Sequence, residues 1–246
     1  MDDKVNKLYE MIKLSRRTVF FTGAGVSTLS GLKDFRSSNG LYNKKEKYPP
    51  EDILSHDFFF NNTEYFYKFY KENLNSLKYS PNIIHKTIKF LQDKGKHISV
   101  VTQNIDGFDK EAGTKNVYEI HGTIMVNHCI SCGKKYNAEY VFNHEGVPKC
   151  TCGGVIKPDV VLYGEALPED TVMSAIYEIE NADLLIIAGT SLSVYPAASF
   201  INYFRGFNIV LINRDNTDYN SRCNLVINDD LGNIFNKLYD KIKTWN

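Results

Sequence analysis

The chain has 246 residues, of which 43% are hydrophobic and 24% charged, so it can bury a complete core as one domain or as a domain with an insert. Its 29 basic residues are balanced by 29 acidic ones, and without a net positive field we expect no nucleic-acid partner. No apolar run approaches the roughly eighteen residues of a membrane span, and the acidic, amphipathic start MDDKVNKLYE does not resemble a secretion signal, so we predict a cytoplasmic protein that does not bind membranes.

Helical patterns and short apolar runs alternate along the chain. The helical patterns place hydrophobic residues three or four positions apart over residues 5–12, 83–91, 172–179 and 234–242. The strand candidates are TVFF, HISVVT, DLLIIA and NIVLI, at residues 18–21, 97–102, 183–188 and 208–212. Because these runs are apolar throughout, they are typical of strands buried on both faces. The sequence therefore predicts an α/β fold built on a parallel sheet.

Two segments interrupt this alternation. Residues 36–80 are rich in aromatic side chains, Asn and Lys, and residues 123–157 carry four of the five cysteines. We predict that they form a smaller domain inserted into a larger one made of residues 1–35, 81–122 and 158–246. The aromatic cluster is interpreted mainly as the core of the smaller domain, although it could also flank a substrate. Its members are Phe58, Phe59, Phe60, Tyr65, Phe66, Tyr67, Phe69 and Tyr70.

A glycine-rich turn follows the first predicted strand. The strand leads into Thr22 and Gly23-Ala24-Gly25, then into small hydroxyl residues and a predicted helix. Such a turn can bring backbone N–H groups against a pyrophosphate, although glycine turns also occur for packing alone. Thr28 stands where the third glycine of a dinucleotide fingerprint should be, and no acidic residue for the ribose is evident about twenty positions later. The turn therefore points away from an ordinary dehydrogenase.

Four cysteines have the spacing of a zinc ribbon. Cys129-x2-Cys132 and Cys150-x-Cys152 are separated by 17 residues, and glycines follow each pair. Four thiolates in this arrangement suit a tetrahedral, structural zinc with no open coordination position. The alternatives are two disulfides or buried thiols without metal, and disulfides are disfavoured in a protein without a secretion signal. The second pair has only one intervening residue, which leaves His144 or His128 as a substitute for the fourth ligand.

Further short segments complete a recognisable series. In chain order they are TGAGVST (22–28), GLKDFR (31–36), TQNID (102–106), His121-Gly122, the paired cysteines, YGE (163–165), GTSL (189–192) and INR (212–214). Together they resemble the sirtuins, the NAD-consuming protein lysine deacylases, in their short bacterial form. The resemblance runs from about residue 15 to residue 240. It implies a Rossmann-like NAD-binding domain with an inserted smaller domain, which combines a helical module and a zinc ribbon.

The resemblance also implies the residues of the reaction centre. Gln103, Asn104, Ile105 and Asp106 would line the nicotinamide and ribose pocket, with Asp106 meeting the carboxamide. His121 would be the catalytic base, and Asn104 and Asp106 would complete the catalytic set. An imidazole suits this role because a ribose hydroxyl has to lose a proton near pH 7. Polar groups gathered after a strand end suit the charge that develops when nicotinamide leaves.

Other implied residues surround this centre. Those expected to bind the remainder of NAD are Ala24 and Thr28 at the phosphates, Phe35 and Arg36 in a mobile cofactor loop, Thr190 and Ser191 near the phosphates and ribose, Asn213 at the adenine-side ribose, and Asp229 at the adenine. Those expected to border the tunnel for an acyl-lysine are Val160, Val161 and Tyr163. The substrate protein or peptide would add there as a strand between two loops. The implied cofactors are therefore NAD as a co-substrate and one structural zinc.

Some positions depart from the family pattern, but none removes a catalytic group. Lys33 stands where a proline usually precedes DFR, Phe108-Asp109 stands where Leu-His is usual, and Tyr163 replaces a common phenylalanine. The absence of a Tyr-x-x-Arg pair in residues 36–80 favours small or apolar acyl groups. Two other functions are weighed against deacylation: protein mono-ADP-ribosylation, and a non-catalytic NAD-sensing module. A sensor has no need of a base, so His121 argues against the last.

Overall fold

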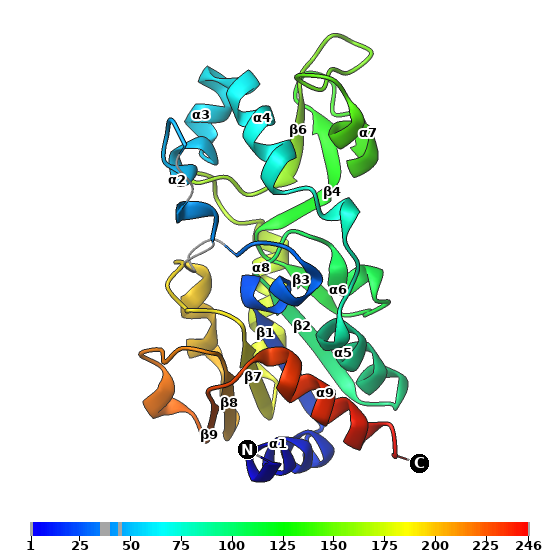
Figure 1. The fold of residues 1–246 in the computed structure, drawn as a ribbon, viewed down its shortest axis with the longest axis vertical. Helices are drawn as coiled ribbons and strands as arrows, with labels where there is room; N and C mark the ends of the chain where they lie inside the picture. Colours follow the sequence, from blue (N-terminus) through cyan, green and yellow to red (C-terminus); the bar gives the residue numbers. More distant parts are fainter. Residues whose placement is uncertain (1, 35–39, 44–45, 246) are drawn as a thin grey trace.

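A parallel sheet forms the larger half of the molecule. The computed structural model describes residues 2–34, 40–43 and 46–245. Its six-stranded sheet has the order β3-β2-β1-β7-β8-β9, and every neighbouring pair is parallel (Figure 1). The strands are β1 (Arg17–Thr22), β2 (His97–Thr102), β3 (Val117–Glu119), β7 (Leu184–Ala188), β8 (Asn208–Ile212) and β9 (Leu225–Ile227). The parallel sheet predicted from the apolar runs is confirmed.

Helices cover both faces of this sheet. Phe20 and Ile186 point to one face, where they pack with α1 (Asp2–Leu14), α5 (Ile83–Asp93) and α9 (Leu231–Ile242). Their neighbours Phe21 and Ile187 point to the other face and pack with α8 (Glu169–Glu180) and the 3₁₀ helix η5 (Ala197–Tyr203). Successive strand residues face opposite sides, so a run that is apolar throughout supplies both cores. The four predicted helices correspond to α1, α5, α8 and α9.

A second, smaller sheet lies in the upper half of Figure 1. It is three-stranded and antiparallel, with the order β5-β4-β6. Its strands are β4 (Gly122–Cys129), β5 (Lys135–Asn137) and β6 (Ile156–Val160). Around it lie α2 (Pro50–Ile53), α3 (His56–Asn61), α4 (Thr63–Asn73) and α7 (Ala138–Asn143), and short helices elsewhere are η4 (Ser76–Lys78), α6 (Phe108–Glu111) and η6 (Asn220–Arg222).

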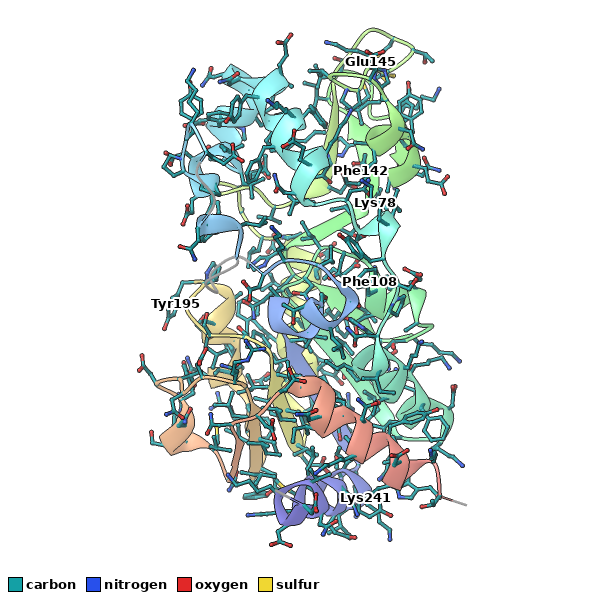
Figure 2. All side chains as sticks on the ribbon, in the orientation of Figure 1. Lys78, Phe108, Phe142, Glu145, Tyr195 and Lys241 are labelled. Carbon is teal, nitrogen blue, oxygen red and sulfur yellow. The ribbon has the colours of Figure 1, made fainter. Side chains whose placement is uncertain are left out.

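The aromatic segment supplies half of the buried core residues of this upper half. Five of its members are buried: Phe59, Phe66, Tyr67, Phe69 and Tyr70. Tyr70 stacks on Phe142 of α7 (Phe142 is labelled in Figure 2), with ring centroids 5.3 Å apart, so the aromatic segment and the cysteine-bearing segment share one core. The interpretation of the cluster as core is confirmed for these five. The division of the chain into two domains stays a prediction, because the shared core also takes in Val160 and Leu162.

The prediction of a helix directly after the glycine-rich turn was wrong. Two 3₁₀ turns replace it, η1 (Ala24–Val26) and η2 (Thr28–Ser30), and Gly31 ends the second with a φ of +100°. An α-helix would use the carbonyl oxygen of Val26 to accept from residue 30. That oxygen accepts from the Nδ2 of Asn82 instead, at 2.8 Å, while the Ser30 amide bonds to Ser27 at 3.0 Å. The contact from Asn82 therefore supports the tighter 3₁₀ form of the turn.

None of the helices in the described part of the chain combines the length and apolar character that crossing a membrane requires.

Candidate active site

Three polar segments meet where β1, β2 and β7 end. These strands are parallel neighbours, so their carboxyl ends lie at one edge of the sheet. The Gln103 amide donates to Thr22 O at 3.0 Å, and its Nε2 donates to the Thr190 Oγ1 at 3.0 Å. Chain order reverses between β1 and β7, and at such switch points open α/β sheets bind their ligands. The geometry thus places the candidate site at this edge.

The glycines at this edge are needed for close packing. A Cβ on Gly25 would lie 2.8 Å from the Cα of Gly189, and one on Gly23 would lie 2.7 Å from the Cβ of Thr190. The Gly25 amide donates to Gly189 O at 2.8 Å, so it is not free for a phosphate. The Ala24 amide, in contrast, has no hydrogen-bond partner among the described residues. Packing therefore occupies the Gly25 amide and leaves the Ala24 amide of the same turn available to a ligand.

A hydrogen-bond relay joins Asn104 to Asp106 through Ser27. The Asn104 Nδ2 donates to Gly23 O and to the Ser27 Oγ, both at 3.1 Å, and the Ser27 Oγ donates to the Asp106 Oδ2 at 2.6 Å. The Phe108 amide donates to the other oxygen of Asp106 at 3.0 Å. Burial raises the pKa of Asp106, and these two donors oppose the rise. Ser27 was not predicted as a site residue, since its only signal in the sequence is its place among the small hydroxyl residues after the turn.

His121 reaches the same edge from β3. Its Nδ1 lies 3.0 Å from the carbonyl oxygen of Gln103, and because a carbonyl only accepts, the Nδ1 carries the proton. The Nε2 of the neutral ring is then free to accept a proton. Burial lowers the pKa of His121, and the Gln103 hydrogen bond partly opposes this. Gly122 is required beside it, since a Cβ there would lie 1.9 Å from Asp159 O. The arrangement holds a neutral imidazole near pH 7.

The residues expected at the acyl-lysine tunnel lie next to His121. The Val161 amide donates to His121 O at 2.9 Å, and Val160 pairs with Gly122 across β4 and β6. Tyr163 is more exposed, and its main chain pairs with Ser55 in an isolated parallel bridge. The structure thus brings these three residues to the side of the site that faces the smaller sheet.

The remaining expected cofactor residues lie along the same edge or outside the described residues. Ile105 follows β2 and its carbonyl accepts from Ile124 at 2.9 Å, while the exposed Ser191 bonds to the Ser193 hydroxyl at 2.7 Å. The Thr28 Oγ1 donates to Gly25 O at 2.9 Å. Asn213 and Asp229 follow β8 and β9, further from the reaction centre residues. Phe35 and Arg36 lie outside the described residues.

The departure at Phe108-Asp109 puts a carboxyl group beneath the site. Asp109 is only 4% exposed, and its Oδ1 has no hydrogen-bond partner among the described residues. Burial raises its pKa to about 8, helped by the negative charges of Asp106 and Glu119. Phe108 beside it is fully buried and packs edge-on against His85. Its burial therefore favours the neutral, protonated form of the Asp109 carboxyl group.

Asp109 is expected to make folding stability fall with rising pH. Its pKa is raised on folding, so its contribution is complete below the unfolded value near 4 and is lost as pH rises to about 8. Within that window the loss in the free energy of unfolding is on the order of 1 kcal/mol per pH unit. Chemical unfolding from pH 4 to 9 should show a shallower decline for Asp109→Asn than for the wild type. The exposed Asp57→Asn is the matched control, and equal slopes for all three proteins would contradict the assignment.

The four cysteines converge at the end of β4. Their sulfur atoms all lie within 4.8 Å of one another, with Cys129 to Cys152 at 3.5 Å and Cys132 to Cys150 at 3.6 Å. Zinc–sulfur bonds of about 2.3 Å in a tetrahedron separate the sulfurs by about 3.8 Å, so the set fits zinc. Amide groups of Ser131 and Cys152 donate to the sulfurs of Cys129 and Cys150, as suits thiolates.

The two histidines considered as substitutes have other partners. His128 Nδ1 contacts a carboxylate oxygen of Asp159, and His144 Nδ1 lies 2.6 Å from Glu145 O. Neither belongs to the group of possible metal ligands in the described chain. The grouping of the four sulfur atoms thus favours Cys152 as the fourth ligand, despite the short spacing of the second cysteine pair.

Comparison with known proteins agrees with this geometry. The Sir2 family model matches residues 23–196. An NAD-dependent protein deacetylase of Clostridium perfringens strain 13 is 51% identical over 244 residues, which are 98% of this chain and 100% of that protein. Another, from Clostridium acetobutylicum, is 48% identical over 94% of this chain and 96% of that protein.

Solved structures of Sir2 proteins are also similar to this chain. A Sir2 protein described with a deacetylated p53 peptide and 3'-O-acetyl ADP-ribose has a TM-score of 0.88 and 34% identity, covering 96% of this chain and 98% of that one. A Sir2 structure with a p53 peptide and NAD+ has a TM-score of 0.85 and 34% identity over 98% of this chain and 99% of that one. The family model covers most of this chain and the relatives cover nearly all of it. The chain therefore belongs to the Sir2 family.

Proposed function

We propose that the protein is an NAD-dependent protein lysine deacylase, which moves an acyl group from lysine to ADP-ribose and releases nicotinamide. The observation that carries this proposal is the position of His121. Its Nδ1–H donates to the Gln103 carbonyl and burial keeps the ring neutral, at the sheet edge where the glycine-rich turn and Asp106 also lie. Relatives that match nearly the whole chain bear the name NAD-dependent protein deacetylase.

The proposed roles follow from the contacts of each side chain. Ala24 and Thr28 bind the phosphates, and Asn104 and Asp106, aligned by Ser27, orient the carboxamide in a dry pocket. Bound NAD supplies the ribose carbon that the acyl oxygen attacks and the nicotinamide that leaves. His121 then accepts a proton at its Nε2 from a ribose hydroxyl. The proposed NAD site is completed by Phe35, Arg36, Gln103, Ile105, Thr190, Ser191, Asn213 and Asp229.

The proposed protein substrate lies against the turn after β6. Val160, Val161 and Tyr163 border the acyl-lysine, and Gly164 next to them has no hydrogen-bond partner for its amide or carbonyl in the described chain. An added strand uses such groups. Tyr195, 69% exposed, lies at the level where the two halves of the molecule meet (Figure 2). A single zinc on four thiolates holds the smaller sheet and takes no part in the chemistry.

The proposed location is the cytoplasm. Four clustered thiols keep their metal only where they stay reduced, and cytoplasmic reductants maintain that state.

Deacylation is expected to consume one NAD for each acyl group removed. Incubation with NAD and a panel of acyl-lysine peptides, followed by mass spectrometry, should give one nicotinamide per deacylated peptide. Small or apolar acyl groups should be removed fastest. Equal deacylation without NAD would overturn the proposal. A protein that instead gains the mass of ADP-ribose, with the acyl-peptide unchanged, would favour mono-ADP-ribosylation.

A further inference from the structure

The hydroxyl groups of Tyr42 and Tyr163 are hydrogen-bonded to each other. Tyr42 belongs to the 3₁₀ turn η3 (Leu41–Asn43), and Tyr163 belongs to the turn that follows β6. A phenylalanine, which is common in the family at this position, could not make this bond because it lacks the hydroxyl group. The bond joins two segments that are far apart in the sequence, and each of them is tied to a different part of the proposed site.

The segment around Tyr163 is fixed through its main chain. The Tyr163 amide donates to Leu54 O, and its carbonyl accepts from the His56 amide, both at 2.9 Å. The Leu162 amide donates to the Glu165 carboxylate at 2.9 Å, which closes the turn over residues 162–165. Two residues earlier, Val161 bonds to His121. The Tyr163 side chain is therefore carried by a turn in direct connection with the proposed base and peptide site.

The segment around Tyr42 is fixed to the nucleotide side. The amide of Leu41 donates to Asp34 O at 2.9 Å, and the Leu41 side chain is fully buried. Asp34 lies just after the glycine-rich segment, which Gly31 ends with a φ of +100°. Movement of that segment therefore reaches Tyr42 through one main-chain hydrogen bond.

We propose that Tyr42 and Tyr163 are a positioning pair that couples NAD binding to acyl-lysine peptide binding; this rests on the proposed function. A ligand on the glycine-rich segment holds Asp34 and, through Leu41, the Tyr42 hydroxyl. A peptide on the turn over residues 162–165 holds the Tyr163 hydroxyl. Each ligand thus orders one half of the pair, and thermodynamic linkage makes the effect on affinity reciprocal.

Calorimetric titration of an acetyl-lysine peptide, with and without unreactive ADP-ribose, measures this coupling. In the wild type, ADP-ribose should tighten peptide binding by about two- to tenfold, the range of one hydrogen bond. Tyr42→Phe and Tyr163→Phe should each bring that ratio close to one. The double variant should lose no more than either single variant, because all three lack the same bond.

Tyr140→Phe is the matched control. Tyr140 is 38% exposed against 42% for Tyr163, and its hydroxyl donates to Lys149 O at 2.8 Å within the cysteine-bearing segment. It should keep the wild-type ratio, which separates coupling from a general effect of removing a hydroxyl. The proposed coupling through Tyr42 and Tyr163 would be overturned if the variants kept the wild-type affinity ratio. It would also be overturned if the losses of the two single variants added up in the double variant. Neither result would touch the proposed function. A wild type that binds neither peptide nor ADP-ribose would overturn the proposed function as well.

Discussion

His121→Ala is expected to slow deacylation by about a hundredfold to ten-thousandfold, the usual contribution of a positioned base. The loss should fall on the later step, because nicotinamide can leave without any proton transfer to His121. Exchange of labelled nicotinamide into NAD, which reports only the earlier step, should survive far better. Asp106→Ala should damage both readouts, since the Asp106 carboxylate is proposed to orient the carboxamide before the two steps diverge.

The comparison needs one acyl-peptide, labelled nicotinamide and three variants. His56→Ala is the matched control, because it removes a half-exposed imidazole that lies outside the proposed catalytic set. The lowered pKa of His121 adds a second signature: the acid limb of the wild-type pH–rate profile should lie below pH 6.5. If His121→Ala abolished exchange as completely as turnover, His121 would hold the cofactor or the fold, and its role as a base would be wrong.

Cys129→Ala is expected to lose zinc and stability together. One zinc per chain should be found in the wild type by elemental analysis, and none in the variant. At a structural zinc site the free energy of metal binding contributes directly to the free energy of folding, and it amounts to about 10–16 kcal/mol in zinc-finger peptides. Cys129 ends β4 and is buried in the core that α4 and α7 share, so losing the metal should unfold this half of the molecule first.

Two controls separate metal loss from cavity formation. Cys223→Ala makes the same chemical change at a partly buried thiol outside the four-cysteine group, and it should keep its zinc and most of its stability. His144→Ala removes a histidine that the sequence offers as an alternative ligand, and this variant should also keep the metal. Thermal unfolding with and without a chelator provides the measurement. Zinc-free wild type that unfolds at an unchanged temperature would contradict the site.

The sequence predicted those parts of the fold that depend on local pattern. The strands β1, β2, β7 and β8 are apolar on both faces, so their composition alone revealed them. The 3₁₀ form of the turn after β1 depends on Asn82, which reaches it from a distant part of the chain. No local pattern carries that information.

The candidate site likewise has parts that the sequence predicted and parts that it did not. The thiol cluster followed from cysteine spacing, but the choice of Cys152 over a histidine depended on partners such as Asp159, which only the fold brings close. Ser27 was missed for the same reason, because its contact with Asp106 exists only when β1 and β2 lie side by side. Single-residue roles that depend on tertiary pairing are therefore the ones a sequence pattern leaves out.

The central place of β1 in the sheet has a consequence for how the chain folds during synthesis. β1 (Arg17–Thr22) pairs with β2 on one side and with β7 (Leu184–Ala188) on the other. One edge of β1 therefore stays unsatisfied until residue 188 has left the ribosome, and such late, non-local pairing makes folding slow. Through most of translation the nascent chain displays an apolar strand edge, which is where chaperone binding or aggregation would begin.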